Sequence, residues 1–184
     1  RQEYSVRQVL VEHQHFNDPE KREHIRRLLI RAAQQKTIPI VNYNDPVSDE
    51  ENRKMELAIR RSHGDQVVEC VDNDETAAVI ANLVHAKKLV LMTSTEGIYR
   101  DPADPKTLVE QVTAKSMEEL EEKVRQLQES CVGASRAGAN GAKAKLEYAL
   151  KSARQGTMVI IGHARHRLSD LVEGRVACTR IGLE

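Results

Sequence analysis

The stretch Gln66-Val-Val-Glu-Cys-Val-Asp-Asn-Asp-Glu-Thr-Ala-Ala-Val-Ile-Ala-Asn-Leu83 joins a short apolar run to the start of a helix. Residues 67–71 are typical of a buried strand, and the apolar side chains after Asp74 recur at the spacing of one helix face. Asp74 is the expected N-cap, because its carboxylate can accept hydrogen bonds from the first free amides. Asp72 and Asn73 then follow the strand, where open α/β sheets bind ligands. The same turn could also serve only to begin the helix.

Composition limits the possible classes of protein. With 184 residues the chain is long enough for one domain with a sizeable core. Its 28 Lys and Arg residues balance 28 Asp and Glu residues, so no overall field attracts nucleic acid or a membrane surface. No stretch approaches the roughly 20 apolar residues of a membrane span. The three widely spaced cysteines favour reduced thiols, and we expect a cytoplasmic protein.

A second strand is expected just before another polar turn. Residues 37–41, Thr-Ile-Pro-Ile-Val, are typical of a strand that a parallel sheet buries on both faces. The run ends abruptly in Asn42-Tyr43-Asn44-Asp45-Pro46. A third strand, Lys88–Thr93, follows the helix after Asp74 and completes a right-handed βαβ unit.

The segment Gly133–Leu146 runs from small residues into a helix. Glycines let backbone amides approach an anion closely. Lys143 and Lys145 near the helix N-terminus oppose the helix dipole, an effect that a bound phosphate reverses. The spacing is not that of the Walker loop, and such loops often carry no ligand, but the pattern favours a polyphosphate. Farther on, His163 and His166 have no evident metal-ligating partners and are interpreted as loop residues.

Four segments in this order resemble the amino-acid kinase family, and within it the glutamate kinase branch. They are Pro39–Val47, Val71–Asp74, Leu89–Pro102 and Gly138–Leu146. Residues Tyr4–Phe16 are similar to the helix that precedes these motifs in the family. The resemblance implies an α/β fold, an αβα sandwich around a mainly parallel sheet. Residues 1–184 would form the C-terminal, substrate- and nucleotide-binding portion of the kinase domain, with its N-terminal part preceding Arg1 and with no C-terminal RNA-binding domain.

The resemblance also implies an activity: MgATP would phosphorylate the γ-carboxylate of L-glutamate, the first step of proline synthesis. By position in the motifs, the residues that would bind glutamate are Asn42, Asn44, Asp45, Asp72 and Asn73. Those that would contact the nucleotide are Thr93, Ser94, Gly138, Ala139, Asn140, Gly141, Lys143 and Lys145. Asp74, which would organise the catalytic lysines, and Lys145 are the expected catalytic residues. ATP and Mg²⁺ would be the cofactors, with no dedicated metal ligands on the chain, and we expect a homo-oligomer with neither a nucleic-acid nor a membrane partner.

Some positions depart from the family pattern. Ser94 replaces an Asp and Tyr43 replaces a Glu, which concerns nucleotide preference and the exact substrate. Further departures are Ala139, Asn140, Ala142 and Cys178. Two alternatives therefore stay open. One is a non-catalytic relative that binds an amino acid or a nucleotide, and the other is a sister kinase acting on a different carboxylate or phosphate.

Overall fold

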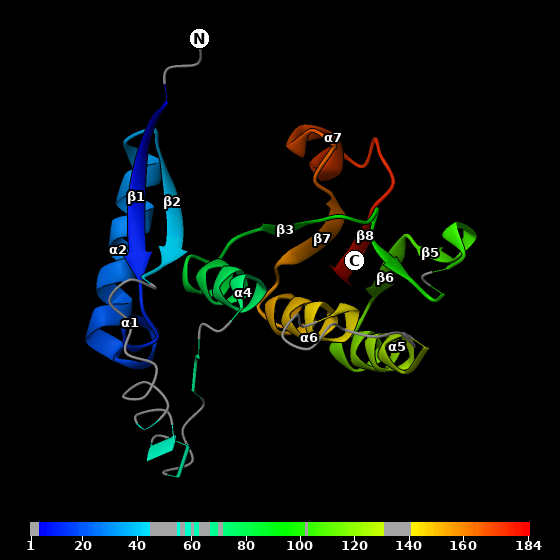
Figure 1. The fold of residues 1–184 in the computed structure, drawn as a ribbon, viewed down its shortest axis with the longest axis horizontal. Helices are drawn as coiled ribbons and strands as arrows, with labels where there is room; N and C mark the ends of the chain where they lie inside the picture. Colours follow the sequence, from blue (N-terminus) through cyan, green and yellow to red (C-terminus); the bar gives the residue numbers. More distant parts are fainter. Residues whose placement is uncertain are drawn as a thin grey trace. The chain divides into compact units, whose positions relative to one another are not determined.

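The computed structural model describes residues 4–44, 55, 58–59, 61–62, 67–69, 72–101, 103–130 and 141–184. Contacts divide the chain into two units, residues 1–79 and 80–184, which are described separately here as unit 1 and unit 2. Figure 1 shows the elements of each. None of the helices that the structure describes has the length and apolar character needed to cross a membrane.

Unit 1 begins with a pair of parallel strands. β1 (Ser5–Val11) pairs with β2 (Thr37–Tyr43), so that Val11 lies opposite Tyr43. The helix expected over Tyr4–Phe16 is therefore wrong, and a single helical turn, α1 (Gln14–Asn17), follows the strand instead. The physical reason is the spacing of the buried residues: Val9 and Val11 alternate with exposed neighbours, which is the period of a strand.

The helix α2 (Pro19–Gln34) covers one face of this pair, with Ile25, Leu29 and Ala32 buried. Asp18 caps it, accepting hydrogen bonds from the amides of the next two non-proline residues at 2.9 and 3.0 Å. The opposite face of the strands is exposed, which corrects the expectation that β2 is buried on both faces. Its apolar side chains are Val6, Leu10, Ile38 and Ile40.

The helix α4 (Asn73–Leu83) begins with Asp72 as its N-cap. Asp72 Oδ1 accepts a hydrogen bond from the Asp74 amide at 2.7 Å, so Asp74 lies in the first turn and is not the cap. The strand expected over residues 67–71 is not seen in its described part, residues 67–69. There the side-chain amide of Asn17 takes the place of a strand partner, donating to Val68 O at 2.7 Å and accepting from Val68 N at 2.9 Å. Residues 70 and 71 lie outside the described residues.

Unit 2 is built on a mixed four-stranded sheet in the order β3-β7-β8-β6. Its strands are β3 (Lys88–Thr93), β6 (Gln111–Ala114), β7 (Met158–His163) and β8 (Thr179–Leu183). β3 is parallel to β7 and β6 is parallel to β8, while β7 and β8 are antiparallel. A small antiparallel pair joins β4 (Ile98–Tyr99) to β5 (Leu108–Val109), with the 3₁₀ turn η2 (Pro105–Thr107) between them.

Helices cover both faces of this sheet (Figure 1). α5 (Met117–Ser130) and α6 (Ala142–Ala153) pack on one face, and α7 (Leu168–Glu173) lies on the other. On β7, Ile160 packs with Leu171 of α7, and Gly162 lies so close to that leucine that a Cβ would stand 2.3 Å from it. The neighbouring strand residues Val159 and Ile161 are also fully buried. This αβα arrangement confirms the expected fold class.

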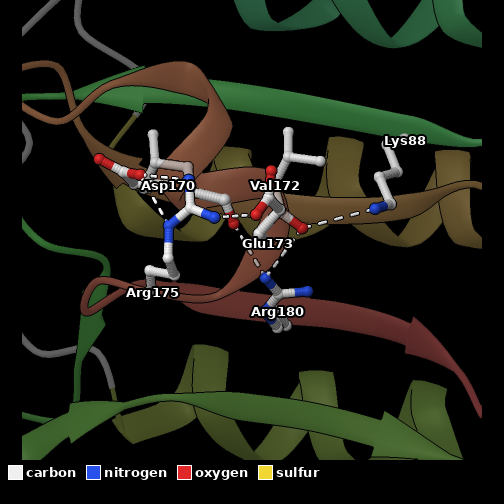
Figure 2. Close-up of polar contacts among 7 residues, drawn as sticks. Lys88, Asp170, Val172, Glu173, Arg175 and Arg180 are labelled. Atoms are coloured by element: carbon white, nitrogen blue, oxygen red, sulfur yellow. Dashed lines mark hydrogen bonds and ion pairs between the residues drawn. The ribbon is translucent and has the colours of Figure 1, made fainter.

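Cationic side chains hold the C-terminal end of α7 (Figure 2). Arg180 on β8 donates to the carbonyls of Leu171 and Val172 at 2.8 and 3.3 Å, and Lys88 on β3 donates to Val172 O at 3.4 Å. Arg175 pairs with two acidic side chains of the same helix. Positive charge at the last carbonyls is favourable for a helix, so this short element is tied to two strands of the sheet.

The outer edge of β6 is also occupied by a lysine. Arg180 N of β8 donates to the Glu110 carbonyl, and Glu184 N, just after β8, donates to the Ala114 carbonyl. The Thr113 carbonyl therefore points away from β8. Lys123 on α5 donates to that carbonyl at 2.8 Å. The lysine therefore covers one of the groups that an added strand would need.

Candidate functional site

Polar groups gather where β1 and β2 end. The Asn44 amide N–H donates to Val11 O at 2.9 Å, which extends the parallel ladder past both strands. The side-chain Nδ2 of Asn44 donates to Glu12 Oε1 at 2.8 Å. Of the other predicted substrate residues here, Asn42 is exposed on β2 and Asp45 lies outside the described residues.

Glu12 is a site residue that the sequence analysis missed. Its second carboxylate oxygen accepts a hydrogen bond from Gln14 Nε2 at 2.7 Å. Hydrogen bonds from Asn44 and Gln14, together with the nearby His15 and His13, hold the pKa of Glu12 below its ordinary value despite partial burial. The signal available in the sequence was an acidic residue directly after an apolar run, but that run was interpreted as part of a helix.

Tyr43, which departs from the family pattern, points into the packed interior of unit 1. Its side chain is buried, and its hydroxyl lies 3.4 Å from Nδ1 of the buried His13. His15 Nδ1 accepts a hydrogen bond from the Glu12 amide at 2.8 Å. His13 and His15 thus stabilise the segment that follows β1, and the Tyr43 side chain fills the interior of unit 1 next to His13.

The predicted acidic turn lies at the start of α4. Asp72 uses one carboxylate oxygen to cap the helix, and its carbonyl accepts from the amide and hydroxyl of Thr76 at 3.0 and 3.2 Å. Asn73 is exposed and Asp74 is half-buried. The structure therefore gives Asp72 a structural role in addition to the binding role that the family resemblance implies.

In unit 2, Thr93 and Ser94 lie at the carboxyl end of β3, as predicted. Thr93 stands opposite His163, the last residue of β7, and Ala164 N donates to Thr93 O at 2.8 Å. Thr93 is half-buried and Ser94 is exposed. The segments that follow these two parallel strands therefore leave the sheet side by side, at the edge where α/β sheets bind ligands.

Glu96 joins these two segments and was also missed in the sequence. Its carboxylate pairs with Arg165 and lies within hydrogen-bond distance, 2.7 Å, of His166 Nε2. The Glu96 side chain is only 17% exposed. The His163 ring lies edge-on to that of His166, with centroids 6.3 Å apart. The sequence analysis treated both histidines as plain loop residues, because the carboxylate that pairs with His166 is 70 residues away.

The predicted phosphate-binding helix, α6, begins after Gly141. Gly141 O accepts hydrogen bonds from the amides of Ala144 and Lys145 at 3.1 and 3.2 Å, which closes the first turn. Lys143 is exposed and Lys145 is half-buried. Because α6 packs on β7 and leads into it through a short turn, its first turn lies towards the edge where β3 and β7 end (Figure 1). Gly138, Ala139 and Asn140 lie outside the described residues.

Within the described ranges, no three His, Cys, Asp or Glu side chains come together so that they could hold a metal ion.

Comparison with known sequences agrees with this arrangement. The sequence profile of the amino acid kinase family matches residues 1–163. The chain belongs to the amino acid kinase family. Relatives within this family include a glutamate 5-kinase of Gloeobacter violaceus, 31% identical over 97% of this chain, and one of Geobacillus kaustophilus, 29% identical over 98%. The chain spans 43% of the length of each.

Solved structures support the same fold. A carbamate kinase from Giardia lamblia bound to AMP-PNP aligns with a TM-score of 0.57, over 89% of this chain and 45% of that one. At 15% identity, this likeness concerns the fold alone. The amino-acid kinase fold expected from the motifs is therefore confirmed.

Proposed function

We propose that residues 1–184 form the C-terminal, substrate- and nucleotide-binding portion of an amino-acid kinase domain, and that this kinase transfers the γ-phosphoryl group of ATP to the γ-carboxylate of L-glutamate. Membership of the amino acid kinase family supports phosphoryl transfer. The glutamate 5-kinases among the relatives, with up to 31% identity, support glutamate as the acceptor.

The observation that carries the proposal is the arrangement at one edge of the unit 2 sheet. Thr93 and Ser94 follow β3, and the first turn of α6, with Lys143 and Lys145, lies towards the same edge. Free amides at a helix N-terminus and lysine ammonium groups are suited to a polyphosphate. In the proposed complex Lys145 neutralises charge on the transferring phosphoryl group, and Thr93 and Ser94 lie beside the nucleotide.

Phosphoryl transfer depends chiefly on positioning and charge neutralisation, so it needs no protein nucleophile. Mg²⁺ commonly binds through substrate phosphates and few carboxylates, and we propose that it enters with ATP. The acceptor would bind in unit 1, and Asp74 would position the catalytic lysines. The proposed acceptor residues are Asn42, Asn44, Asp45, Asp72 and Asn73.

A hydroxylamine trap tests this function directly. The chain is incubated with MgATP, L-glutamate and hydroxylamine, and γ-glutamyl hydroxamate is quantified. In Lys145→Ala we expect the rate to fall by about a hundredfold or more, because a charge that stabilises the transition state is lost.

The matched control is Lys151→Ala, which removes a lysine from the other end of the same helix. Lys151 is exposed and pairs with Glu147 at 2.8 Å, so its loss should leave the rate unchanged. Absence of hydroxamate in the unsubstituted chain would contradict the proposed activity for these residues. Binding of L-glutamate without turnover would then favour the non-catalytic relative, and turnover of another acceptor would favour the sister kinase.

A further inference from the structure

A groove of about 650 Å³ runs along the outer edge of β6, beside α5. Three cationic side chains line it: Arg100, Lys115 and Lys123. Two acidic side chains also line it, and both are already bonded, since Glu119 pairs with Lys123 at 2.7 Å and Glu184 Oε1 accepts from Thr113 Oγ1 at 2.5 Å. Of the three cations, only Lys123 pairs with a carboxylate of the described residues. The charge that remains available in the groove is therefore positive and favours an anionic ligand.

The backbone of β6 presents a short series of polar groups to this groove. The carbonyls of Glu110 and Ala114 face β8, so Gln111 and Thr113 turn their N–H and C=O groups outward. Thr113 O accepts from Lys123 Nζ at 2.8 Å. No group in the part of the chain that the structure describes bonds to Gln111 N, Gln111 O or Thr113 N. The edge thus offers a donor, an acceptor and a donor in sequence, followed by an ammonium group.

This series matches the last residues of an extended peptide that runs parallel to β6. A terminal residue opposite Val112 would donate its N–H to Gln111 O, and its carboxylate would accept from Thr113 N and Lys123 Nζ. The carbonyl two residues earlier in the peptide would accept from Gln111 N. A peptide that continued past this point would need Thr113 O, which Lys123 already occupies. The edge therefore fits the end of a chain and not the middle of one.

We infer that the outer edge of β6 binds the C-terminal carboxylate of an extended peptide, and that Lys123 contacts this carboxylate. An ammonium group has three N–H donors, and in Lys123 two of them serve Thr113 O and Glu119. The third is left for the ligand. This peptide site does not depend on the proposed kinase activity.

The register also predicts which terminal residue is preferred. Residues opposite one another on parallel strands have their side chains on the same face of the sheet. The terminal side chain would therefore lie on the face of the buried Val112, near Leu127, which lines the same groove. An apolar terminal residue such as leucine fits this position.

Binding is tested by NMR on the ¹⁵N-labelled chain with the peptide acetyl-Gly-Thr-Val-Thr-Leu, which has a free C-terminal carboxylate. The backbone amide signals of Gln111 and Thr113 should shift downfield, while those of Val112 and Ala114, which face β8, should change little. The same peptide with a C-terminal amide should bind at least about tenfold more weakly, because a charge-assisted hydrogen bond is lost. Acetate at the same concentration should not move the Gln111 and Thr113 signals, since it lacks the peptide groups.

The role of Lys123 is tested with a matched pair of variants. Lys123→Ala should lower the affinity for the free-acid peptide by about tenfold and remove its advantage over the amidated peptide. Lys151→Ala removes a lysine from an equivalent pair on α6, in which Lys151 and Glu147 are also four residues apart and 2.8 Å from one another. This control should leave the affinity unchanged.

Four results would overturn the inference. They are equal affinity for the free-acid and amidated peptides, equal effects of Lys123→Ala and Lys151→Ala, a response to acetate as large as that to the peptide, and Gln111 and Thr113 amides that do not respond to the peptide at about 1 mM. None of these measurements uses ATP or L-glutamate, so the result is independent of whether hydroxamate forms.

Discussion

At the residue scale, one structural role and one proposed binding role fall on the single carboxylate of Asp72. It caps α4 through Oδ1, and its position in the family motif places it among the proposed acceptor residues. A capping carboxylate cannot turn freely towards a ligand without releasing the helix amide. The geometry of the proposed acceptor site is therefore coupled to the stability of the first turn of α4.

Substitution of Asp72 should separate these two roles. Asp72→Ala removes the cap, and we expect the free energy of unfolding to fall by about 1 kcal/mol. Asp72→Asn keeps a capping oxygen, so its stability in urea denaturation should stay close to that of the unsubstituted chain while binding of L-glutamate weakens. Equal stability of Asp72→Ala and the unsubstituted chain would contradict the capping role.

The sequence could predict only part of the candidate site, for a physical reason visible in single residues. Asn44, Thr93 and Lys145 were expected from the family resemblance, and each stands next to an apolar run or a small-residue loop. Glu12 and Glu96 join the candidate site through hydrogen bonds to residues 32 and 70 positions away in the sequence. Such pairs depend on strand pairing, which local patterns do not specify.

At the element scale, the segment after β3 is held by a buried threonine of β8. Thr179 Oγ1 accepts from Ile98 N at 2.8 Å and donates to Val109 O at 2.6 Å, which ties the β4–β5 pair to the sheet. Gly97 is needed for this approach, because a Cβ there would lie 2.4 Å from Thr179 Oγ1. The loop that carries Ser94 and Glu96 is thus fixed at its far end.

Gly97→Ala should therefore destabilise unit 2. The added methyl group meets the Thr179 hydroxyl and, at 2.9 Å, its backbone nitrogen, so we expect a loss of about 1–3 kcal/mol in thermal or urea unfolding. Gly182→Ala is the matched control: its Cβ meets the flexible end of Met158 at 3.0 and 3.1 Å, and the change should stay within about 1 kcal/mol. Similar losses in both variants would argue against the role assigned to Thr179.

An element whose ends are marked by polar or turn residues in the sequence was predicted well. The strand Lys88–Thr93 has the bounds expected from the sequence. Residues 5–11 were misinterpreted because a short run with three valines and a leucine fits a helix face nearly as well as a strand. Pairing with β2 decides the outcome, and that pairing is a tertiary effect.

At the scale of the whole molecule, the two units differ in how their sheets are covered. The unit 2 sheet has helices on both faces, whereas the strand pair of unit 1 leaves Ile38 and Ile40 exposed by 48% and 52%. Parallel strands are normally buried on both faces. An exposed apolar face of this kind favours association.

The double substitution Ile38→Thr with Ile40→Thr should reduce association of the chain and its binding of a hydrophobic dye, as measured by light scattering and fluorescence. Threonine keeps the β-branched shape, and each side chain is exposed, so each substitution should change unfolding by no more than about 0.5 kcal/mol. Ile25→Thr makes the same chemical change at a buried position and should cost about 2 kcal/mol. Loss of stability in the double variant comparable to that of Ile25→Thr would indicate that the face is packed.

Lys123 at the edge of β6 makes the two edges of the unit 2 sheet unequal in their ability to accept another strand. With Lys123 bonded to the outward carbonyl of Thr113, a further strand at β6 would first have to displace an ammonium group that also pairs with Glu119. Among the strands that the structure describes, β3 lies at the other end of the order and forms the other edge. Additional polypeptide, whether from a longer chain or from a second copy, would therefore extend this sheet beyond β3.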